Sequence, residues 1–101
     1  MAFRFLKFKV YQDAKILHRK VVFLSKKFPI EFYYLKDQIR RSSLSIILQV
    51  AEGSANETAA ALDVSFELGL IAQTEYDELL RLCEEVVNQL GGLSKKLLVV
   101  G

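Results

Sequence analysis

The chain has 101 residues, of which 51 % are apolar and 26 % are charged, with five glycines and one proline. This composition excludes a disordered or fibrous chain, and the length predicts a single domain over residues 1–101 that buries roughly 65 % of its unfolded surface. The net charge of +2 hides an asymmetry, because residues 1–50 carry eleven Lys and Arg against three Asp and Glu, whereas residues 51–101 carry three against nine.

This asymmetry has two interpretations. Oppositely charged helices can lie side by side, or subunits can meet head to tail; alternatively, the basic half forms a face for nucleic acid. The longest uncharged apolar run, 42–51, is about half a membrane span. The start, MAFRFLKFKV, interleaves charge with Phe and does not resemble a signal peptide. The lone Cys83 offers no disulfide framework, so the sequence predicts a cytoplasmic protein that contacts no membrane.

The first fifty residues predict an arm and two helices. We expect the segment FRFLKFKV to be an extended arm that lays its phenylalanines on a neighbouring surface, because no partner strand exists elsewhere. An unbroken heptad seam then predicts a helix that packs at a shallow angle and ends before Pro29. A second helix is expected over about 30–52, with Gly53 as its stop. The seams comprise Val10, Ala14, Leu17, Val21, Leu24 and Phe28, then Phe32, Leu35, Ile39, Ser42, Ser43, Ile46 and Val50.

The second half predicts one short and one long helix. The short helix covers about 57–68, turns Leu62 and Phe66 to a core and ends at Gly69. The long helix starts at Thr74, which caps it with Asp77 in a capping-box-like pair. It is expected to continue through Gly91-Gly92 to about Leu97, because the heptad keeps its phase there. Its seam comprises Tyr76, Leu79, Leu80, Cys83, Val86, Val87, Leu90, Leu93 and Leu97.

The C-terminal half of the second helix is apolar on nearly every side, which is typical of a helix buried all round. A bundle of this length has no position for an enclosed helix, so we expect another subunit to bury it; burial by the N-terminal arm is the alternative. The predicted oligomer interface comprises Arg41, Leu44, Ser45, Leu48, Gln49, Ala51 and Glu52.

Five cations form the candidate nucleic-acid surface: Lys15, Arg19, Lys26, Lys36 and Arg40. Contacts of such residues with phosphates would be salt-dependent and weakly sequence-specific. Arg41 can pair with Asp37 at i,i+4, so Arg40 is the better candidate for an outward ligand. A scaffold for a protein partner and a merely solubilising face are the alternatives.

Residues with catalytic or metal-binding chemistry are few. His18 lies away from the seam and is expected to be solvated, while Cys83 is expected to be a small core residue. The pairs Asp77-Glu78 and Glu84-Glu85 diverge on a helix and predict a solvated face. Phosphate loops, Cys/His ligand sets and nucleophile triads are absent from the sequence, which therefore predicts no enzyme, cofactor, metal or small-molecule substrate.

The segments VYQDAKIL (10–17), QIRRSSLSI (38–46), VAEGSA (50–55) and LGLI (68–71) resemble the four-helix-bundle proteins encoded in intervening sequences of bacterial 23S rRNA genes, an S23 ribosomal protein-like family. The accessory proteins of diversity-generating retroelements are similar in fold. The resemblance implies an all-α, up-down antiparallel four-helix bundle, a ring-like homopentamer and a role in binding RNA or DNA, with no enzyme activity.

Two departures from the family pattern stand out. Ile47-Leu48-Gln49 replaces the usual Pro-Ala-Asn. In the family, a long third helix begins shortly after an Ala-Glu-Gly motif and passes through an Ala-x-Gly-Ser-x-x-Glu motif, whereas residues 53–58 of this chain fuse the two motifs. A helix of about 12 residues spans only about 18 Å, which is too short to return the chain along helices of about 30 Å. Either residues are missing between Gly53 and Asn56, or the deletion is real and favours a helix fused from about Ile30 to Leu68 or an exchange of helices between subunits.

Overall fold

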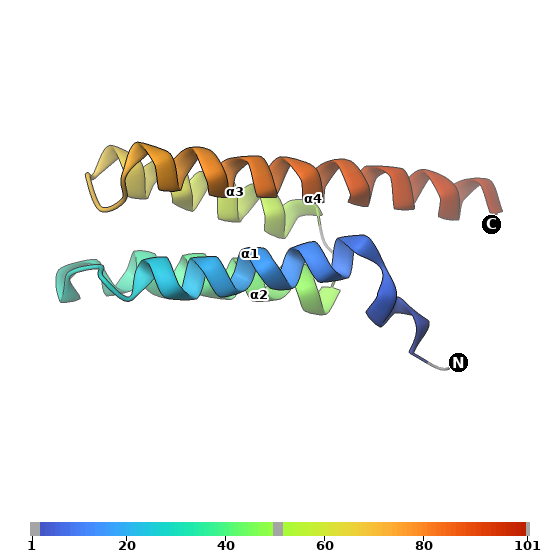
Figure 1. Ribbon diagram of the computed structural model, residues 1–101, viewed down its shortest axis with the longest axis horizontal. Coiled ribbons are helices and arrows are strands. Elements are labelled where there is room, and N and C mark those ends of the chain that lie inside the picture. Colours follow the sequence, from blue (N-terminus) through green and yellow to red (C-terminus); the bar gives the residue numbers. More distant parts are fainter. Residues whose placement is uncertain (1–2, 50–51, 101) are drawn as a thin grey trace.

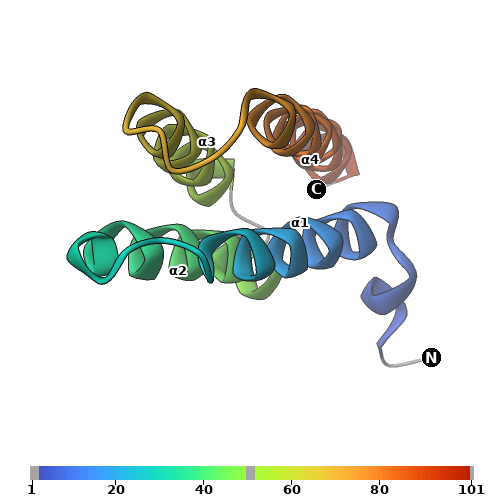
Figure 2. The same cartoon turned by 60° about the vertical axis from the view of Figure 1, so that its left-hand side comes forward.

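Four helices form an up-down antiparallel bundle, as the sequence predicts. The computed structural model describes residues 3–49 and 52–100, and of these it leaves undescribed the side chains at 4, 5, 49, 52 and 92–100. The helices are α1 (Lys9–Ser25), α2 (Tyr33–Gln49), α3 (Glu52–Glu67) and α4 (Gln73–Val100). Each helix packs against its neighbours in the chain, and α4 closes the bundle on α1 (Figure 1). Figure 2 shows α1 beside α2 in one layer and α3 with α4 in the other.

The core is built mainly from the predicted seams, but Phe32 and Leu80, which were predicted to lie on them, are half-buried and outside the core. Every predicted seam residue of the first helix is buried, and Leu17 and Val21 are completely enclosed. Heptad spacing brings these side chains to one side of α1, where they meet the corresponding side of the other helices. Val50 lies outside the described residues, as do the side chains of Leu93 and Leu97. The core residues are Val10, Ala14, Leu17, Val21, Leu24, Phe28, Leu35, Ile39, Ile46, Ala55, Ala61, Leu62, Ile71, Leu79, Cys83, Val86 and Leu90.

The N-terminal segment is not the extended arm that we expected. Residues Arg4–Lys7 form a short 3-10 helix, η1, in which the Leu6 amide donates to the Phe3 carbonyl at 3.1 Å. The Gln12 side chain also donates to the Leu6 carbonyl and ties this turn back to α1. Local hydrogen bonds therefore satisfy the backbone here without a partner strand.

The boundary between α2 and α3 differs from its prediction. We expected α2 to reach Glu52 and α3 to begin at Glu57; α2 ends at Gln49, and α3 begins at Glu52 with Gly53 in its first turn. The fused helix from Ile30 to Leu68 does not form, and α3 runs unbroken through the segment 53–56. Helices α1, α2 and α3 have 17, 17 and 16 residues. They therefore span about 25 Å each, which removes the predicted mismatch in length.

The connection between α3 and α4 confirms one prediction and corrects another. Gly69 ends α3 with a positive φ of 73 degrees. The Leu70 amide donates to the Ser65 carbonyl at 2.9 Å, which is a Schellman-type stop. The cap of α4 is not Thr74 with Asp77. Glu75 Oε1 instead accepts the Ala72 amide at 2.8 Å, because a carboxylate at the third helical position reaches back to the residue that precedes the helix.

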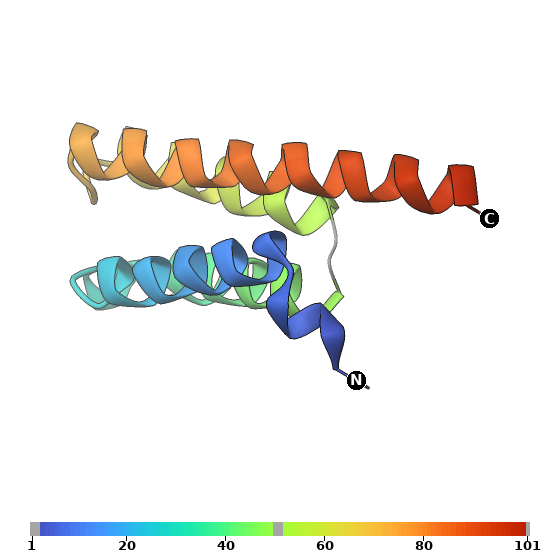
Figure 3. The same cartoon turned by 45° about the vertical axis from the view of Figure 1, so that its right-hand side comes forward.

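The last helix is much longer than the other three. As predicted, α4 continues through Gly91-Gly92, and it reaches Val100 after 28 residues. A helix of this length spans about 42 Å. Its C-terminal part extends past the beginning of α3, at the same end of the bundle as η1 (Figures 1 and 3). None of the described helices is both long and apolar enough to cross a membrane.

Candidate nucleic-acid interface

A groove of about 790 Å³ runs between the C-terminal half of α1 and the first turns of α4. Leu24 and Leu79, both buried core residues, lie at its base. Its other lining residues are Arg19, Lys20, Phe23, Lys26, Lys27, Glu75 and Glu78. The α1 wall thus carries four cations and an aromatic ring, and the α4 wall carries two carboxylates.

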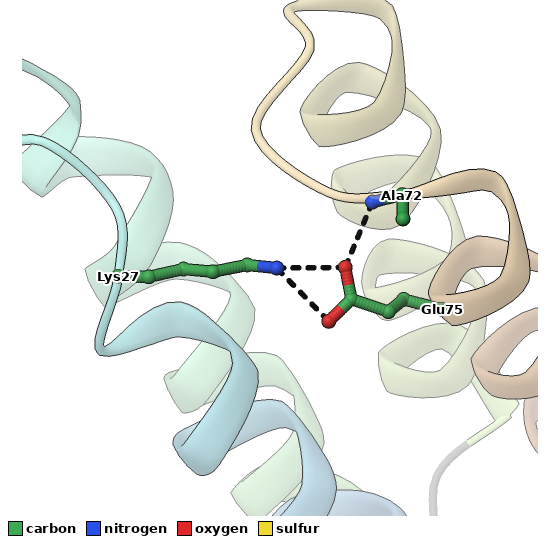
Figure 4. Close-up of polar contacts among 3 residues, drawn as sticks. All are labelled: Lys27, Ala72 and Glu75. Carbon is green, nitrogen blue, oxygen red and sulfur yellow. Dashed lines mark hydrogen bonds and ion pairs between the residues drawn. The ribbon is translucent and has the colours of Figure 1, made fainter.

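Lys20 of α1 and Lys27, which follows the end of α1, are paired across this groove. Lys27 Nζ donates to both carboxylate oxygens of Glu75, at 2.7 and 2.9 Å (Figure 4), and Lys20 Nζ donates to Glu78 Oε1 at 2.7 Å. The hydrogen bond from Lys27, together with the Ala72 amide, lowers the pKa of the Glu75 carboxyl below its ordinary value. The basic half and the acidic half of the chain therefore meet side by side, which was the first interpretation of the charge asymmetry.

None of the five predicted cations forms an ion pair with a residue that the structure describes, and four of them also have no hydrogen-bonded protein partner of the kind that holds Arg40. Lys15 and Arg19 are exposed on α1, and Lys15 Nζ lies 4.9 Å from the centre of the Tyr11 ring. Lys26 follows at the end of α1 and lies 5.8 Å from the Phe23 ring centre. Lys36 is half-buried on α2. These four side chains, Lys15, Arg19, Lys26 and Lys36, are called the basic surface below.

Arg40 does not point outward as expected. It is half-buried against α1, where Nε donates to Ser25 Oγ at 2.7 Å and Nη2 donates to the Val22 carbonyl at 3.0 Å. Helix ends leave carbonyls without intrahelical partners and favour a cation nearby. Because α1 has no basic residue in its own last turn, Arg40 supplies that charge from α2. Arg41 instead is exposed and pairs with Asp37 at 3.3 Å, the i,i+4 pair that the sequence predicts.

Sequence reasoning missed the role of the only histidine. His18 was expected to be solvated, but it is half-buried, and its Nδ1 lies 2.8 Å from Ser43 Oγ. Ser43 Oγ also donates to the Arg40 carbonyl at 3.1 Å. Desolvation, followed by the charge of Arg40, lowers the pKa of the imidazole. The histidine thus bridges α1 and α2.

Hydrogen bonds between hydroxyl groups join α2 to α3. Thr58 Oγ1 donates to Ser42 Oγ at 2.8 Å in the fully buried interface, and Ser54 Oγ donates to Ser45 Oγ at the same distance. Neighbouring serines of α2 therefore serve different helices, since Ser43 faces α1 and Ser42 faces α3. No pattern in the sequence reveals this division, because each partner comes from another helix.

The predicted oligomer face is uncovered in the single chain. Leu48 is 71 % exposed and Leu44 is 41 % exposed, so the alternative in which the N-terminal arm buries them is wrong. Ser45 is half-buried and bonded to Ser54, which leaves Arg41 and the two leucines as its outward members. Ala51 and the side chains of Gln49 and Glu52 lie outside the described residues.

The residues considered for chemistry have structural surroundings. Cys83 is buried as predicted, and burial raises the pKa of its thiol to about 12. The nucleophilic thiolate is therefore scarce at neutral pH. The four acidic residues Asp77, Glu78, Glu84 and Glu85 are exposed, as expected. In the described part of the chain, no three His, Cys, Asp or Glu side chains gather closely enough to hold a metal ion.

The family model for the 23S rRNA-intervening sequence protein matches residues 6–55, about half of the chain. Residues 6–55 are therefore similar to that family. Neither the curated proteins nor the solved structures contain a match. The similarity in fold to accessory proteins of diversity-generating retroelements stays a prediction.

The matched segment covers part of η1, the whole of α1 and α2, and the first turn of α3. The match ends at Ala55, inside the segment 53–58 where the sequence departs from the family pattern. The residues that carry the resemblance have structural duties in this chain: Ile39 is completely buried, Arg40 holds α1, and Ser42 accepts the hydrogen bond from Thr58.

Proposed function

We propose that the protein is a non-enzymatic, oligomeric bundle that binds RNA or DNA through the basic surface. The observation that carries this proposal is the contrast between two sets of cations, of which Arg19, Lys20, Lys26 and Lys27 line the same groove. Lys20 and Lys27 are held by carboxylates of α4, whereas Lys15, Arg19, Lys26 and Lys36 have no carboxylate partner among the described residues. Cations left in this state can exchange their counterions for phosphates without breaking an internal ion pair.

Arg40 is not part of this proposed contact set, although the sequence suggested it. Its guanidinium already donates to Ser25 and to the Val22 carbonyl, so a phosphate would have to compete with both bonds. Its charge still adds to the positive potential near Lys36, one turn earlier on the same helix.

The test is binding of a labelled oligonucleotide, followed by fluorescence anisotropy over a range of salt concentrations. If the four cations of the basic surface each neutralise one phosphate, affinity should fall roughly 50- to 150-fold between about 50 and 200 mM salt. The double variant Arg19→Gln/Lys26→Gln should bind more weakly and show a shallower dependence on salt. Arg81→Gln removes the same kind of charge from an exposed position on α4 outside the groove and should change little. Equal effects of both variants would contradict the proposal.

We also propose that the protein is a homo-oligomer, with a ring-like pentamer as the expected assembly, and that Leu44 and Leu48 lie in the subunit contact. Adjacent exposed leucines on one helix face are costly in water and typical of an interface. Light scattering, with absorbance at 260 and 280 nm, reports assembly size and bound nucleic acid together. Leu48→Asn should reduce the assembly size, whereas Leu68→Asn, at an exposed leucine after α3, should not. A monomeric wild type would refute this proposal.

A scaffold for a protein partner is the second candidate, and the two carboxylates in the groove favour it. Glu75 and Glu78 lower the positive charge of the groove and suit a partner with mixed charges better than a polyanion. This alternative predicts a stoichiometric protein complex that persists between about 50 and 200 mM salt, a range over which phosphate contacts weaken strongly.

A further inference from the structure

We propose that the Phe23 ring is a stacking platform for an unpaired base, so that the basic surface binds single-stranded nucleic acid in preference to a duplex. This inference rests on the proposed nucleic-acid binding and names the form of nucleic acid. It comes from the position of one aromatic ring among the cations of α1.

The exposure of Phe23 is unusual for its position. The side chain is 76 % exposed, although it lies inside α1 and next to Leu24, which is 5 % exposed. Phe23 is the one large apolar side chain of α1 that is exposed, in a helix that the structure describes completely. It lines the groove but adds nothing to the packed core, so water solvates a ring that could cover another flat surface.

The neighbours of Phe23 are suited to a nucleic-acid backbone. Arg19 precedes it by four residues and Lys26 follows by three, so the three side chains share one side of α1, with Cβ atoms of neighbours about 5–6 Å apart. Lys26 Nζ lies 5.8 Å from the ring centre. A base on the ring would therefore have a cation on each side for its flanking phosphates, which is the combination found in single-strand binding surfaces.

The opposite wall of the groove would keep the strand on α1. Glu75 and Glu78 repel a polyanion, and their pairing with Lys27 and Lys20 removes those lysines from competition for phosphate. The phosphates would then follow the line from Lys15 through Arg19 to Lys26, which spans about 16 Å along α1. This length is enough for a few nucleotides.

The form of the nucleic acid follows from the ring. In a duplex the faces of the bases are covered by stacking on one another, so an exposed phenylalanine gains little from the outside of a double helix. A single strand presents unstacked bases, each with a face that an aromatic side chain can cover. Stacking of this kind tolerates any base, and we expect little sequence preference.

The experiment compares an unstructured oligouridylate with an RNA duplex of the same length, using the full chain. Phe23→Ala should weaken binding of the single strand roughly 5- to 100-fold and leave duplex binding within about twofold. Tyr33→Ala is the matched control, because Tyr33 is also an exposed aromatic residue but does not line the groove. Circular dichroism should give the same unfolding temperature for Phe23→Ala as for the wild type, since the ring is solvated.

A second variant tests the stacking directly. The chain contains no tryptophan, so Phe23→Trp introduces a single fluorophore at the proposed platform. Its fluorescence should be quenched by the single strand and remain unchanged with the duplex. The inference would be overturned if Phe23→Ala weakened the binding of single strand and duplex equally, or weakened neither. It would also be overturned if the single strand left the fluorescence of Phe23→Trp unquenched.

The two proposals can fail separately. If Arg19→Gln/Lys26→Gln weakens binding and Phe23→Ala does not, the protein binds nucleic acid without stacking on Phe23. If the wild type binds neither oligonucleotide, both proposals fail.

Discussion

The two sides of α2 differ in how their exceptions to the usual relation between polarity and burial are accommodated. The side toward α1 and α3 carries Arg40, Ser42 and Ser43, which are half-buried or buried, whereas the opposite side exposes Leu44 and Leu48. The polar side is tolerated because each of its groups has a partner, and no described buried side-chain nitrogen or oxygen lacks one. The apolar side has no cover in the single chain. The comparison shows that partnered polar groups share the buried side of α2 with the core residues Leu35, Ile39 and Ile46, while two leucines lie on its exposed side.

The largest change in stability is expected when the two adjacent arginines, Arg40 and Arg41, are compared. Arg40→Gln removes two charge-assisted hydrogen bonds from the end of α1. This loss should lower the free energy of unfolding by about 2 kcal/mol. Arg41→Gln breaks only an exposed pair with Asp37, and such a loss should cost under about 0.5 kcal/mol. Urea denaturation at matched protein concentration measures both values. Equal costs would show that the two sides of α2 do not differ energetically.

A smaller effect is expected at the contact between α2 and α3. Thr58→Val keeps the shape of a fully buried side chain but removes the hydroxyl that donates to Ser42. The loss of this hydrogen bond should cost about 1 kcal/mol. Thr74→Val, at an exposed position in the first turn of α4, serves as the control. A surface substitution of this kind should cost under about 0.5 kcal/mol. Thermal unfolding followed by circular dichroism would rank the pair, and a neutral Thr58→Val would mean that packing alone holds this interface.

The smallest effect is the dependence of stability on pH through His18. Its pKa is lowered in the folded chain from the ordinary value of 6.5, so the unfolded chain binds the proton more readily. Stability is therefore complete above about pH 6.5 and decreases as the pH falls below that value. The carboxyls of Asp13 and Glu75 also have lowered pKa values, but they titrate below 4.5 and contribute only in more acidic solution.

The variant His18→Gln isolates this effect, because the chain has a single histidine. Its unfolding free energy should be nearly constant between about pH 7 and pH 5, while that of the wild type falls. A wild-type stability that rises on acidification over this interval would show that the imidazole gains, rather than loses, from its place between α1 and α2.

The heptad pattern was sufficient to predict the helices and their buried sides, because burial of an apolar stripe depends only on spacing along one helix. The ends of α2 and α3 could not be placed in the same way. Gly53 looked like a stop, yet it is helical, since the chain gains more from matching the lengths of three helices than it loses through one glycine. The predicted cap of α4, Thr74 with Asp77, was also wrong. The Glu75 carboxylate reaches the Ala72 amide and caps the helix instead.

The surface was predicted less well than the core. The spacing of Lys15, Arg19 and Lys26 correctly places them on one side of α1, but nothing local to the sequence distinguishes them from Lys20 and Lys27, whose partners are 58 and 48 residues away. Arg40 was misplaced because the carbonyl and hydroxyl that hold it belong to α1. A long polar side chain is positioned by partners that only the assembled bundle brings within reach.

The closure of the bundle by α4 on α1 has a consequence for the order of folding. The other helix contacts join chain neighbours and can form early from the hairpins α1–α2 and α3–α4. The contacts of α1 with α4 include the hydrogen bond from Gln89 to Asp13, far apart in the sequence, and they require the closure of the longest loop. We therefore expect two hairpins to form first and to dock last. The groove that carries Phe23 is created only in that docking step.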